Sequence, residues 1–264
     1  MRSFPWCLLA LGLIGCHSPG STAIPEARAD ERRRSAGVAV VELFTSEGCS
    51  SCPPADGVLA ELSRQGREGG MPVYAIAFHV DYWDELGWPD RFASPAHTAR
   101  QRSYSRAFGT REMYTPQMVV DGSDAFVGSD RDRAVDSVAR ALGRPATAAV
   151  SLHARPSGPD AVAVDYEVKG APPGATLSIV VVDRPVSVAV RGGENAGRTL
   201  HHTDTARALL TVALAQPSGT QVVQVPRDAT RDGVIAFVQQ AAAEGRDDAS
   251  GMPILGAARV SLAP

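Results

Sequence analysis

A helix-like stretch between two short apolar runs is the first clear element pattern in the chain. Residues 38–44 and 73–80 are nearly continuous β-prone apolar runs, which are typical of strands buried on both faces. The stretch between them carries apolar residues at helical spacing, namely Ala55, Val58, Leu59 and Leu62. This order predicts a βαβ unit whose two strands are parallel.

A strand, a hairpin partner and a helix follow later in the chain. Residues 118–120 predict a strand that ends in the turn Asp121-Gly122, and residues 125–128 predict its hairpin partner. Asp130 can cap a helix whose one side carries Ala134, Val135, Val138, Ala139 and Leu142. Together with the βαβ unit, these elements predict an α/β domain over residues 37–145.

Beyond this domain the pattern changes to short runs separated by Pro- and Gly-rich turns. Alternation of apolar and polar residues is clearest in residues 161–168. The runs predict strands over residues 149–154, 162–168, 177–182, 186–190, 209–215, 221–225, 234–239 and 257–262. Many short strands at this spacing predict an all-β sandwich-like domain over residues 146–264, in which we identify no catalytic constellation.

The first residues, 1–15, have the pattern of a signal peptide. A positive start at Met1-Arg2 precedes the apolar residues 4–15, a run too short to span a bilayer. It ends in Leu13-Ile14-Gly15-Cys16, which resembles the bacterial lipobox. We therefore expect cleavage before Cys16 and a lipid on that cysteine; an ordinary secretory peptide and a misassigned start codon are the alternatives.

Residues 16–36 read as a lipidated N-terminus followed by a flexible tether, since they are rich in Pro, Ser, Ala and charge and lack periodicity. His17 stands where an aspartate would signal retention in the inner membrane, which favours the outer membrane. We expect a protein of the bacterial cell envelope, in the periplasm, held by a lipid anchor rather than by a spanning helix.

Composition narrows the classes of function. The 264 residues include 44% hydrophobic and 21% charged residues, as in globular proteins, and a net charge of −3 argues against nucleic-acid binding. Of the four cysteines, Cys7 leaves with the signal peptide and Cys16 is blocked by lipid. The mature protein then has one thiol pair, Cys49 and Cys52.

This pair lies where the first strand gives way to the helix. Unpaired N–H groups and the partial positive charge at a helix N-terminus stabilise a thiolate. We expect Cys49 to be the more exposed, lower-pKa sulfur and Cys52 to be sheltered and to resolve mixed disulfides. An inert structural disulfide and half of a metal site are alternatives, although no second cysteine pair completes a zinc site.

The order of elements, with Cys49-Ser50-Ser51-Cys52 and Thr115-Pro116, resembles the thioredoxin fold. The resemblance implies that Pro116 is cis and lies against the disulfide, and that Thr115 contacts an extended substrate. The chain departs from ordinary thioredoxins because it lacks their Trp-Cys-Gly-Pro-Cys signature and carries an insertion at residues 81–111. These departures leave the direction of electron flow open.

Four longer sequence motifs narrow the resemblance from the thioredoxin fold to a particular family. They are residues 44–56 around the cysteines, residues 78–84 (Phe-His-Val-Asp-Tyr-Trp-Asp) with 86–88, residues 114–117, and Gly193-Glu194-Asn195 before Gly197-Arg198. Together they resemble a family of secreted bacterial thioredoxin-like proteins classed as a domain of unknown function. The resemblance covers residues 38–262 and implies the fold, but it implies no substrate.

The insertion follows the carboxyl end of the second strand, the edge at which open α/β sheets bind ligands. Tyr82 and Trp83, with Trp88, are candidates to line a substrate groove, and His79 or Asp81 is a candidate to carry a proton to Cys52. The alternative is a capping lid with a core Trp and a hydrogen-bonded His.

For the other charged and polar residues, we prefer an interpretation without a catalytic or metal-binding role. Residues 95–108 predict a helix whose Arg100, Arg102 and Arg106 form a solvated face, and Glu47 is expected to point to solvent. His153 and the pair His201-His202 are interpreted as polar surface residues rather than metal ligands. We expect the second domain to pack beside the first and to shape or recognise a partner, with residues 192–198 as its contact loop.

Three functions remain open. The first is a thiol–disulfide oxidoreductase acting on protein or small-molecule thiols and disulfides in the envelope, for which no cofactor is expected; a peroxidase is a weaker enzymatic variant. The second is a binding or scaffold protein with a structural disulfide. The third is a copper-binding or copper-delivery protein that uses Cys49, Cys52 and His79, because soft thiolates favour Cu(I).

Overall fold

The computed structural model describes residue 1 and residues 37–240 and 251–262. The predicted signal peptide, the lipidation site Cys16 and the tether lie outside the described residues. The described residues from 37 onward belong to one compact unit. Among the described residues, no helix has both the length and the apolar character needed to cross a membrane.

The first sheet has four strands in the order β2-β1-β3-β4. β1 (Ala39–Thr45) pairs in parallel with β2 (Val73–His79), as predicted, because α2 (Pro53–Arg67) connects them. β1 also pairs antiparallel with β3 (Gln117–Val120), which forms a hairpin with β4 (Asp124–Val127). All of β1 is buried, as its continuous apolar run predicts.

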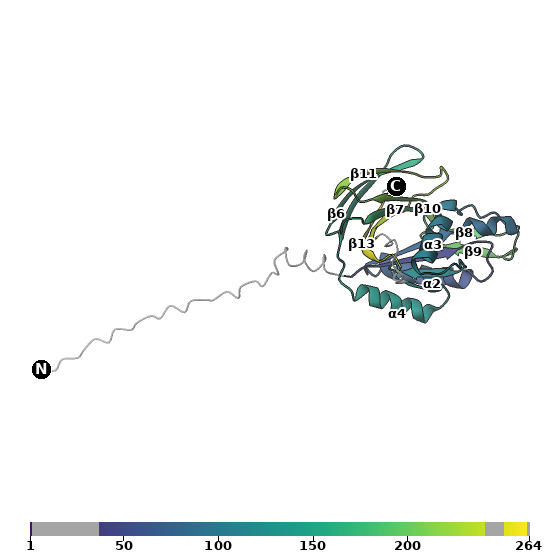
Figure 1. Ribbon diagram of the computed structural model, residues 1–264, viewed down its shortest axis with the longest axis horizontal. Helices are drawn as coiled ribbons and strands as arrows, with labels where there is room; N and C mark the ends of the chain where they lie inside the picture. Colours follow the sequence, from purple (N-terminus) through teal and green to yellow (C-terminus); the bar gives the residue numbers. More distant parts are fainter. Residues whose placement is uncertain (2–36, 241–250, 263–264) are drawn as a thin grey trace. The chain divides into compact units, whose positions relative to one another are not determined.

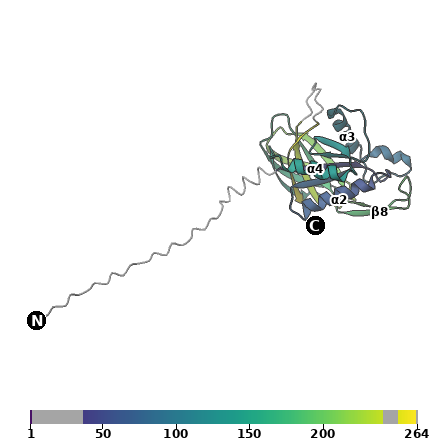
Figure 2. The ribbon, with the colours of Figure 1, turned by 90° about the horizontal axis from the view of Figure 1, so that it is seen from below.

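Two helices cover one face of this sheet. α2 buries the predicted stripe of apolar side chains, and α4 (Arg131–Leu142) buries Ala134, Val138 and Ala141 beside it. The carboxylate of Asp130 accepts a hydrogen bond from the backbone N–H of Arg133 at 3.1 Å, which confirms the predicted cap. In Figure 1, α2 and α4 lie on one side of the unit and β6 and β11 on the other; the view from below has both helices in front (Figure 2).

The second half of the chain forms two further sheets, ordered β10-β7-β12-β13 and β11-β6-β5, and a separate hairpin of β8 and β9. The two larger sheets share one apolar core, to which β6, β7 and β12 contribute alternate residues. The strands are β5 (Ala149–Pro156), β6 (Ala161–Lys169), β7 (Thr176–Val182), β8 (Val186–Ala189), β9 (Thr199–His202), β10 (Ala206–Ala213), β11 (Ser218–Gln224), β12 (Gly233–Gln239) and β13 (Ile254–Ser261).

The two halves of the chain share a third core. It joins the face of the first sheet that α2 and α4 leave open to the outer face of the β10-β7-β12-β13 sheet and to α3 (Pro95–Ala107). Phe44, Phe78 and Tyr104 meet Val180, Ile235 and Phe237 there. The layers therefore follow in the order helices, first sheet, second sheet, third sheet.

A buried ion pair crosses this third core and corrects one prediction. Arg100, expected on a solvated face, is only 8% exposed, and its guanidinium pairs with the fully buried carboxylate of Glu42 on β1. Tyr104 also donates to Glu42, and Arg100 donates to the side chain of Gln239 on β12 at 3.2 Å. α3 is thus held at the junction of both halves. Across the described residues the fold is mixed α/β, with several largely antiparallel sheets and no closed barrel.

Candidate functional site

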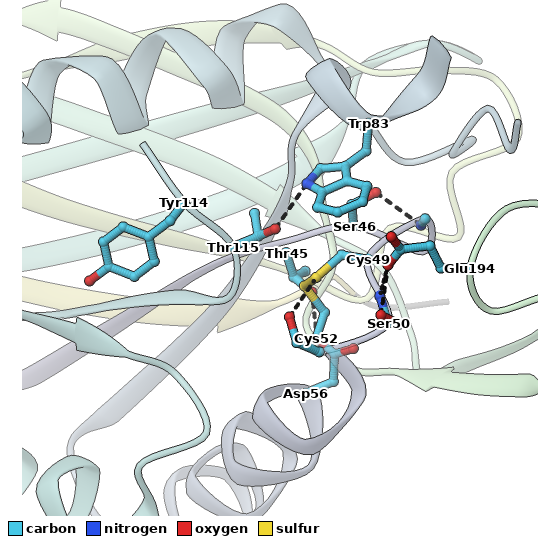
Figure 3. The surroundings of a disulfide bond; sticks show 12 residues. Thr45, Ser46, Cys49, Ser50, Cys52, Asp56, Trp83, Tyr114, Thr115 and Glu194 are labelled. Atoms are coloured by element: carbon cyan, nitrogen blue, oxygen red, sulfur yellow. Dashed lines mark hydrogen bonds between the residues drawn. A yellow bond between two sulfur atoms is a disulfide. The ribbon is translucent and has the colours of Figure 1, made fainter. Parts of the chain in front are cut away.

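A disulfide joins Cys49 and Cys52 at the start of α2, with 5.4 Å between their Cα atoms. Cys52 immediately precedes the helix, and Pro53 and Pro54 occupy its first two positions. Proline is tolerated there because a first-turn residue needs no intrahelical N–H bond. The disulfide is thereby fixed at the positive end of the helix (Figure 3).

Burial of the disulfide corrects a second prediction. Cys49 was expected to be the exposed sulfur, but both cysteines are 0% exposed, and only Ser50 and Ser51 between them reach solvent. Trp83 packs over the loop before Cys49 (Figure 3), and the carbonyl of Cys49 accepts a hydrogen bond from Asn195. Asn195 belongs to the loop that the sequence predicts as a contact, but the burial of Cys49 beneath it and Trp83 depends on where the tertiary structure places both groups.

Of the predicted substrate-side residues, Thr115 and Trp83 lie together beside the disulfide (Figure 3). The Thr115–Pro116 peptide bond is cis, as the resemblance implies. The indole Nε1 of Trp83 donates to Thr115 Oγ1 at 2.9 Å, so the insertion is tied to the segment that precedes β3 (Figure 3). Thr115 and Trp83 are therefore joined to each other among the groups around the disulfide.

Tyr82 and Asp81 lie in a short 3-10 helix, η1 (Asp81–Leu86). Tyr82 is 37% exposed and donates to the side chain of Gln101 at 3.2 Å; partial burial raises the pKa of Tyr82 to about 12. The carboxylate of Asp81 accepts a bond from Thr98 Oγ1 at 2.5 Å, which ties η1 to α3. Asp81 makes no hydrogen bond to either cysteine in the described structure.

A carboxyl group that the sequence did not single out, that of Asp56, lies among the groups around the disulfide (Figure 3). Asp56 stands four residues after Cys52 in α2, so both side chains are on one helix face and that of Asp56 leans back toward the N-terminus (Figure 3). Thr45 Oγ1 donates to Asp56 at 2.9 Å. Burial raises the pKa of Asp56, although the charges of His202 and His79 and the bond from Thr45 oppose the rise.

His79 lies beside Thr45, its partner in the β1–β2 register, and is fully buried. Its Nδ1 is 2.6 Å from Asp90, while its Nε2 has no hydrogen-bond partner among the described residues. Burial opposes protonation of the ring, but Asp90, Asp56 and Glu47 outweigh it and raise the pKa of His79. His79 therefore lies behind the disulfide loop, paired with Asp90, without bonding to either cysteine.

Glu47 and His202 form a second buried pair and correct two more predictions. Glu47, expected to face solvent, is 1% exposed and accepts from Trp88 Nε1 at 2.7 Å. His202 Nε2 lies 3.0 Å from Glu47, and its ring packs edge-on against His79 with 4.8 Å between centroids. His201 and His202 lie on β9, where alternation turns His202 inward and His201 outward. This period-two pattern was the missed signal.

The predicted contact loop is confirmed. Asn195 is fully buried and donates to the carbonyls of Glu47 and Cys49 at 2.9 and 2.8 Å. Glu194 accepts two bonds from Ser50, one from its backbone N–H at 3.0 Å and one from its hydroxyl at 2.6 Å (Figure 3). The loop between β8 and β9 therefore contacts the cysteine loop directly.

The Asp90–His79 pair predicts a pH-dependent contribution to stability. Burial raises the pKa of Asp90, but His79 and the backbone N–H groups of Glu47 and Phe92 outweigh it, so the pKa falls from 3.8 to about 2. A carboxyl with a lowered folded-state pKa contributes stability above its unfolded pKa and loses it as the pH falls toward the folded value. Asp90→Asn should therefore cost about 2 kcal/mol near pH 6 and flatten the acid limb between pH ~4 and ~2.

Thermal melts of Asp90→Asn between pH 2 and 7 measure this effect. The exposed Asp136 of α4 offers a matched control, because Asp136→Asn makes the same chemical change without a buried partner. An acid limb of Asp90→Asn as steep as that of the unmodified protein would refute the assignment.

No group of three or more His, Cys, Asp or Glu side chains within residues 37–240 and 251–262 is arranged to hold a metal ion. The histidines and carboxylates behind the disulfide are instead joined in pairs to one another. The site is thus a buried disulfide with a charged polar cluster behind it and a loop from the second half of the chain above it.

Comparisons with known proteins agree with the motif resemblance. The model of a family described as "Protein of unknown function (DUF1223)" matches residues 40–239. The crystal structure of protein AGR_C_4864 from Agrobacterium tumefaciens is similar, with 29% identity, a TM-score of 0.61, and coverage of 85% of this chain and 94% of that chain. No curated protein matches the sequence significantly. The match over most of the folded chain shows that this protein belongs to the DUF1223 family.

Proposed function

We propose that this protein is a thiol–disulfide oxidoreductase of the bacterial cell envelope, built on a thioredoxin-like arrangement of residues 37–145. One observation carries the proposal: the Cys49–Cys52 disulfide stands at the N-terminus of α2 with Thr115, the residue before a cis proline, among the groups around it (Figure 3). The sheet order β2-β1-β3-β4 with α2 and α4 on one face agrees with the assignment. The lipid anchor on Cys16 and the outer-membrane location are part of the same proposal.

The chemistry is a two-electron exchange. In the reductive direction, the Cys49 thiolate attacks a substrate disulfide, forms a mixed disulfide and releases one substrate thiolate. The Cys52 thiolate then attacks Cys49 Sγ, releases the second substrate thiolate and closes the Cys49–Cys52 disulfide. The substrate gains two electrons and the protein dithiol loses two; the oxidative direction reverses both steps.

We assign Asp56 as the group that accepts the proton of the Cys52 thiol. Its position one helical turn after Cys52 and the burial that raises its pKa suit a group that takes up the thiol proton as Cys52 attacks. Asp56 replaces His79 and Asp81 in this role, because Asp56 stands one helical turn after Cys52, whereas neither His79 nor Asp81 bonds to a cysteine in the described structure.

Asp56→Asn should separate stability from activity. A raised folded-state pKa means that ionisation of Asp56 costs stability, which falls as the pH rises above about 4 and through the folded-state pKa. The neutral amide removes this cost, so we expect a stabilisation of about 1 kcal/mol at pH 7. Because proton uptake is lost, exchange should slow by about tenfold or more.

Urea denaturation and the rate of oxidised-glutathione reduction at pH 6–9 measure the two effects of Asp56→Asn. Asp132→Asn is the matched control, since Asp132 is an exposed acid in the first turn of α4. A destabilised Asp56→Asn variant with unchanged exchange kinetics would show that Asp56 serves packing alone.

Burial of Cys49 favours one competing function. A scaffold protein with a structural disulfide requires an inaccessible, unreactive Cys49, and that side chain is 0% exposed. Equilibration of the full chain with glutathione buffers separates the two functions. An oxidoreductase should have a potential between about −120 and −270 mV, whereas a structural disulfide lies below about −300 mV.

A further inference from the structure

Glu194 contacts the cysteine loop in a way that thiol exchange does not require. It lies in the loop between β8 and β9, far from Cys49 in sequence, and its carboxylate accepts from the N–H and the hydroxyl of Ser50 at 3.0 and 2.6 Å. Gly193 and Gly197 have φ angles of 66° and 81°, a conformation that other residues adopt rarely, and they fold the loop back on itself. Glu194 and Ser50 are both exposed.

Asn195 anchors the loop that carries this carboxylate. Its amide is fully buried and bonds to the carbonyls of Glu47 and Cys49, while Arg198 donates to its Oδ1 at 2.7 Å. The backbone at Glu194 is therefore anchored beside the cysteine loop, and the carboxylate itself is held there by its two bonds from Ser50. A negative charge is held next to Cys49 in the disulfide form of the protein (Figure 3).

Such a carboxylate opposes a thiolate on Cys49 in two ways. Backbone N–H groups beside a cysteine at a helix start stabilise its thiolate, and Glu194 engages the N–H of Ser50, the residue next to Cys49. The like charge of the carboxylate also raises the thiol pKa. The bonds from Ser50 lower the pKa of Glu194, so this charge persists at neutral pH.

We infer that Glu194 is a positioning residue that favours the oxidised form of the Cys49–Cys52 pair, because its carboxylate, bound to the N–H and the hydroxyl of Ser50, opposes negative charge on the neighbouring Cys49 sulfur. The inference rests on the proposed function and names the residue that regulates it. Because the negative charge of Glu194 destabilises the reduced form, the Cys49–Cys52 dithiol donates electrons to a substrate disulfide more readily. Loss of the charge should shift the pair toward a stronger oxidant.

Glu194→Gln isolates the charge, because glutamine keeps the length of the side chain and an oxygen that can accept from Ser50. In the reduced full chain, we expect about threefold more Cys49 thiolate at pH 7, measured as the rate of iodoacetamide alkylation against pH. The equilibrium constant with glutathione should shift about threefold toward the dithiol. This shift corresponds to a reduction potential that is about 14 mV less negative. Glu194→Ala, which removes both the charge and the acceptor, should shift both quantities at least as far.

Glu167→Gln is the matched control, since Glu167 is an exposed glutamate on β6, in the third sheet, with the same change in net charge. A Glu194→Gln protein with the thiol pKa and potential of the Glu167→Gln control would overturn the inference. Alkylation reports on Cys49 whether or not the protein exchanges disulfides. Failure of exchange in the unmodified protein would therefore refute the proposed function and leave the effect of Glu194 measurable.

Discussion

Cys49→Ser should abolish disulfide exchange, with a loss of about 10³-fold or more, whereas Cys52→Ser should leave a stable mixed disulfide on Cys49. Removal of the attacking sulfur eliminates the covalent intermediate, but removal of the resolving sulfur eliminates only its breakdown. The proposed order assigns resolution to Cys52, which immediately precedes α2 one helical turn before Asp56, and attack to Cys49, which lies in the loop under Trp83 and Asn195.

Mass spectrometry of each variant after incubation with oxidised glutathione measures both outcomes. Non-reducing gels of envelope extracts that contain Cys52→Ser then reveal protein partners as adducts. Exchange that persists in Cys49→Ser would contradict the mechanism. A stable adduct on Cys49→Ser but none on Cys52→Ser would show that the roles of the two sulfurs are reversed.

Arg100→Met should be strongly destabilising, with a cost of about 3–5 kcal/mol. Loss of the guanidinium leaves the carboxylate of Glu42, which is 0% exposed on β1, without its counter-charge. Because Arg100 also donates to Tyr104 and Gln239, the variant loosens the junction between the two halves of the chain.

Urea denaturation at pH 7 provides the free energy of unfolding for this comparison. Arg102→Met is the control, since Arg102 is an exposed arginine on the same helix. The double variant with Glu42→Met should recover most of the loss, because a well-packed apolar pair can replace a buried ion pair. An Arg100→Met cost no larger than that of Arg102→Met would mean that the pair contributes nothing.

The elements of the first half could be predicted because their signals are local. The continuous apolar run of β1 and the helical stripe of α2 led directly to a parallel pair with a connecting helix. The Asp130 cap and the Asp-Gly turn between β3 and β4 likewise depend on neighbours in sequence. Periods of two and 3.6 residues encode which face is buried.

The covering of the first sheet could not be predicted in this way. The apolar pattern shows that both faces of β1 are buried, but not that a second β-sheet, rather than more helices, covers one of them. Arg100 illustrates the difficulty: its own helix is polar on average, and its partner Glu42 lies 58 residues away. A charged side chain becomes a core residue only when another element brings a counter-charge to it.

The sequence by itself determined the cysteine pair at the start of a helix, the Thr115–Pro116 segment and the loop motif around Glu194, because each is a short run of residues with its own chemistry. The tertiary structure alone decided that the disulfide is buried and that carboxylates and histidines surround it. Asn195 and Cys49 are 146 residues apart. The burial and the electrostatic environment of the sulfur atoms depend on many residues that are distant in sequence, so no local sequence pattern can predict them.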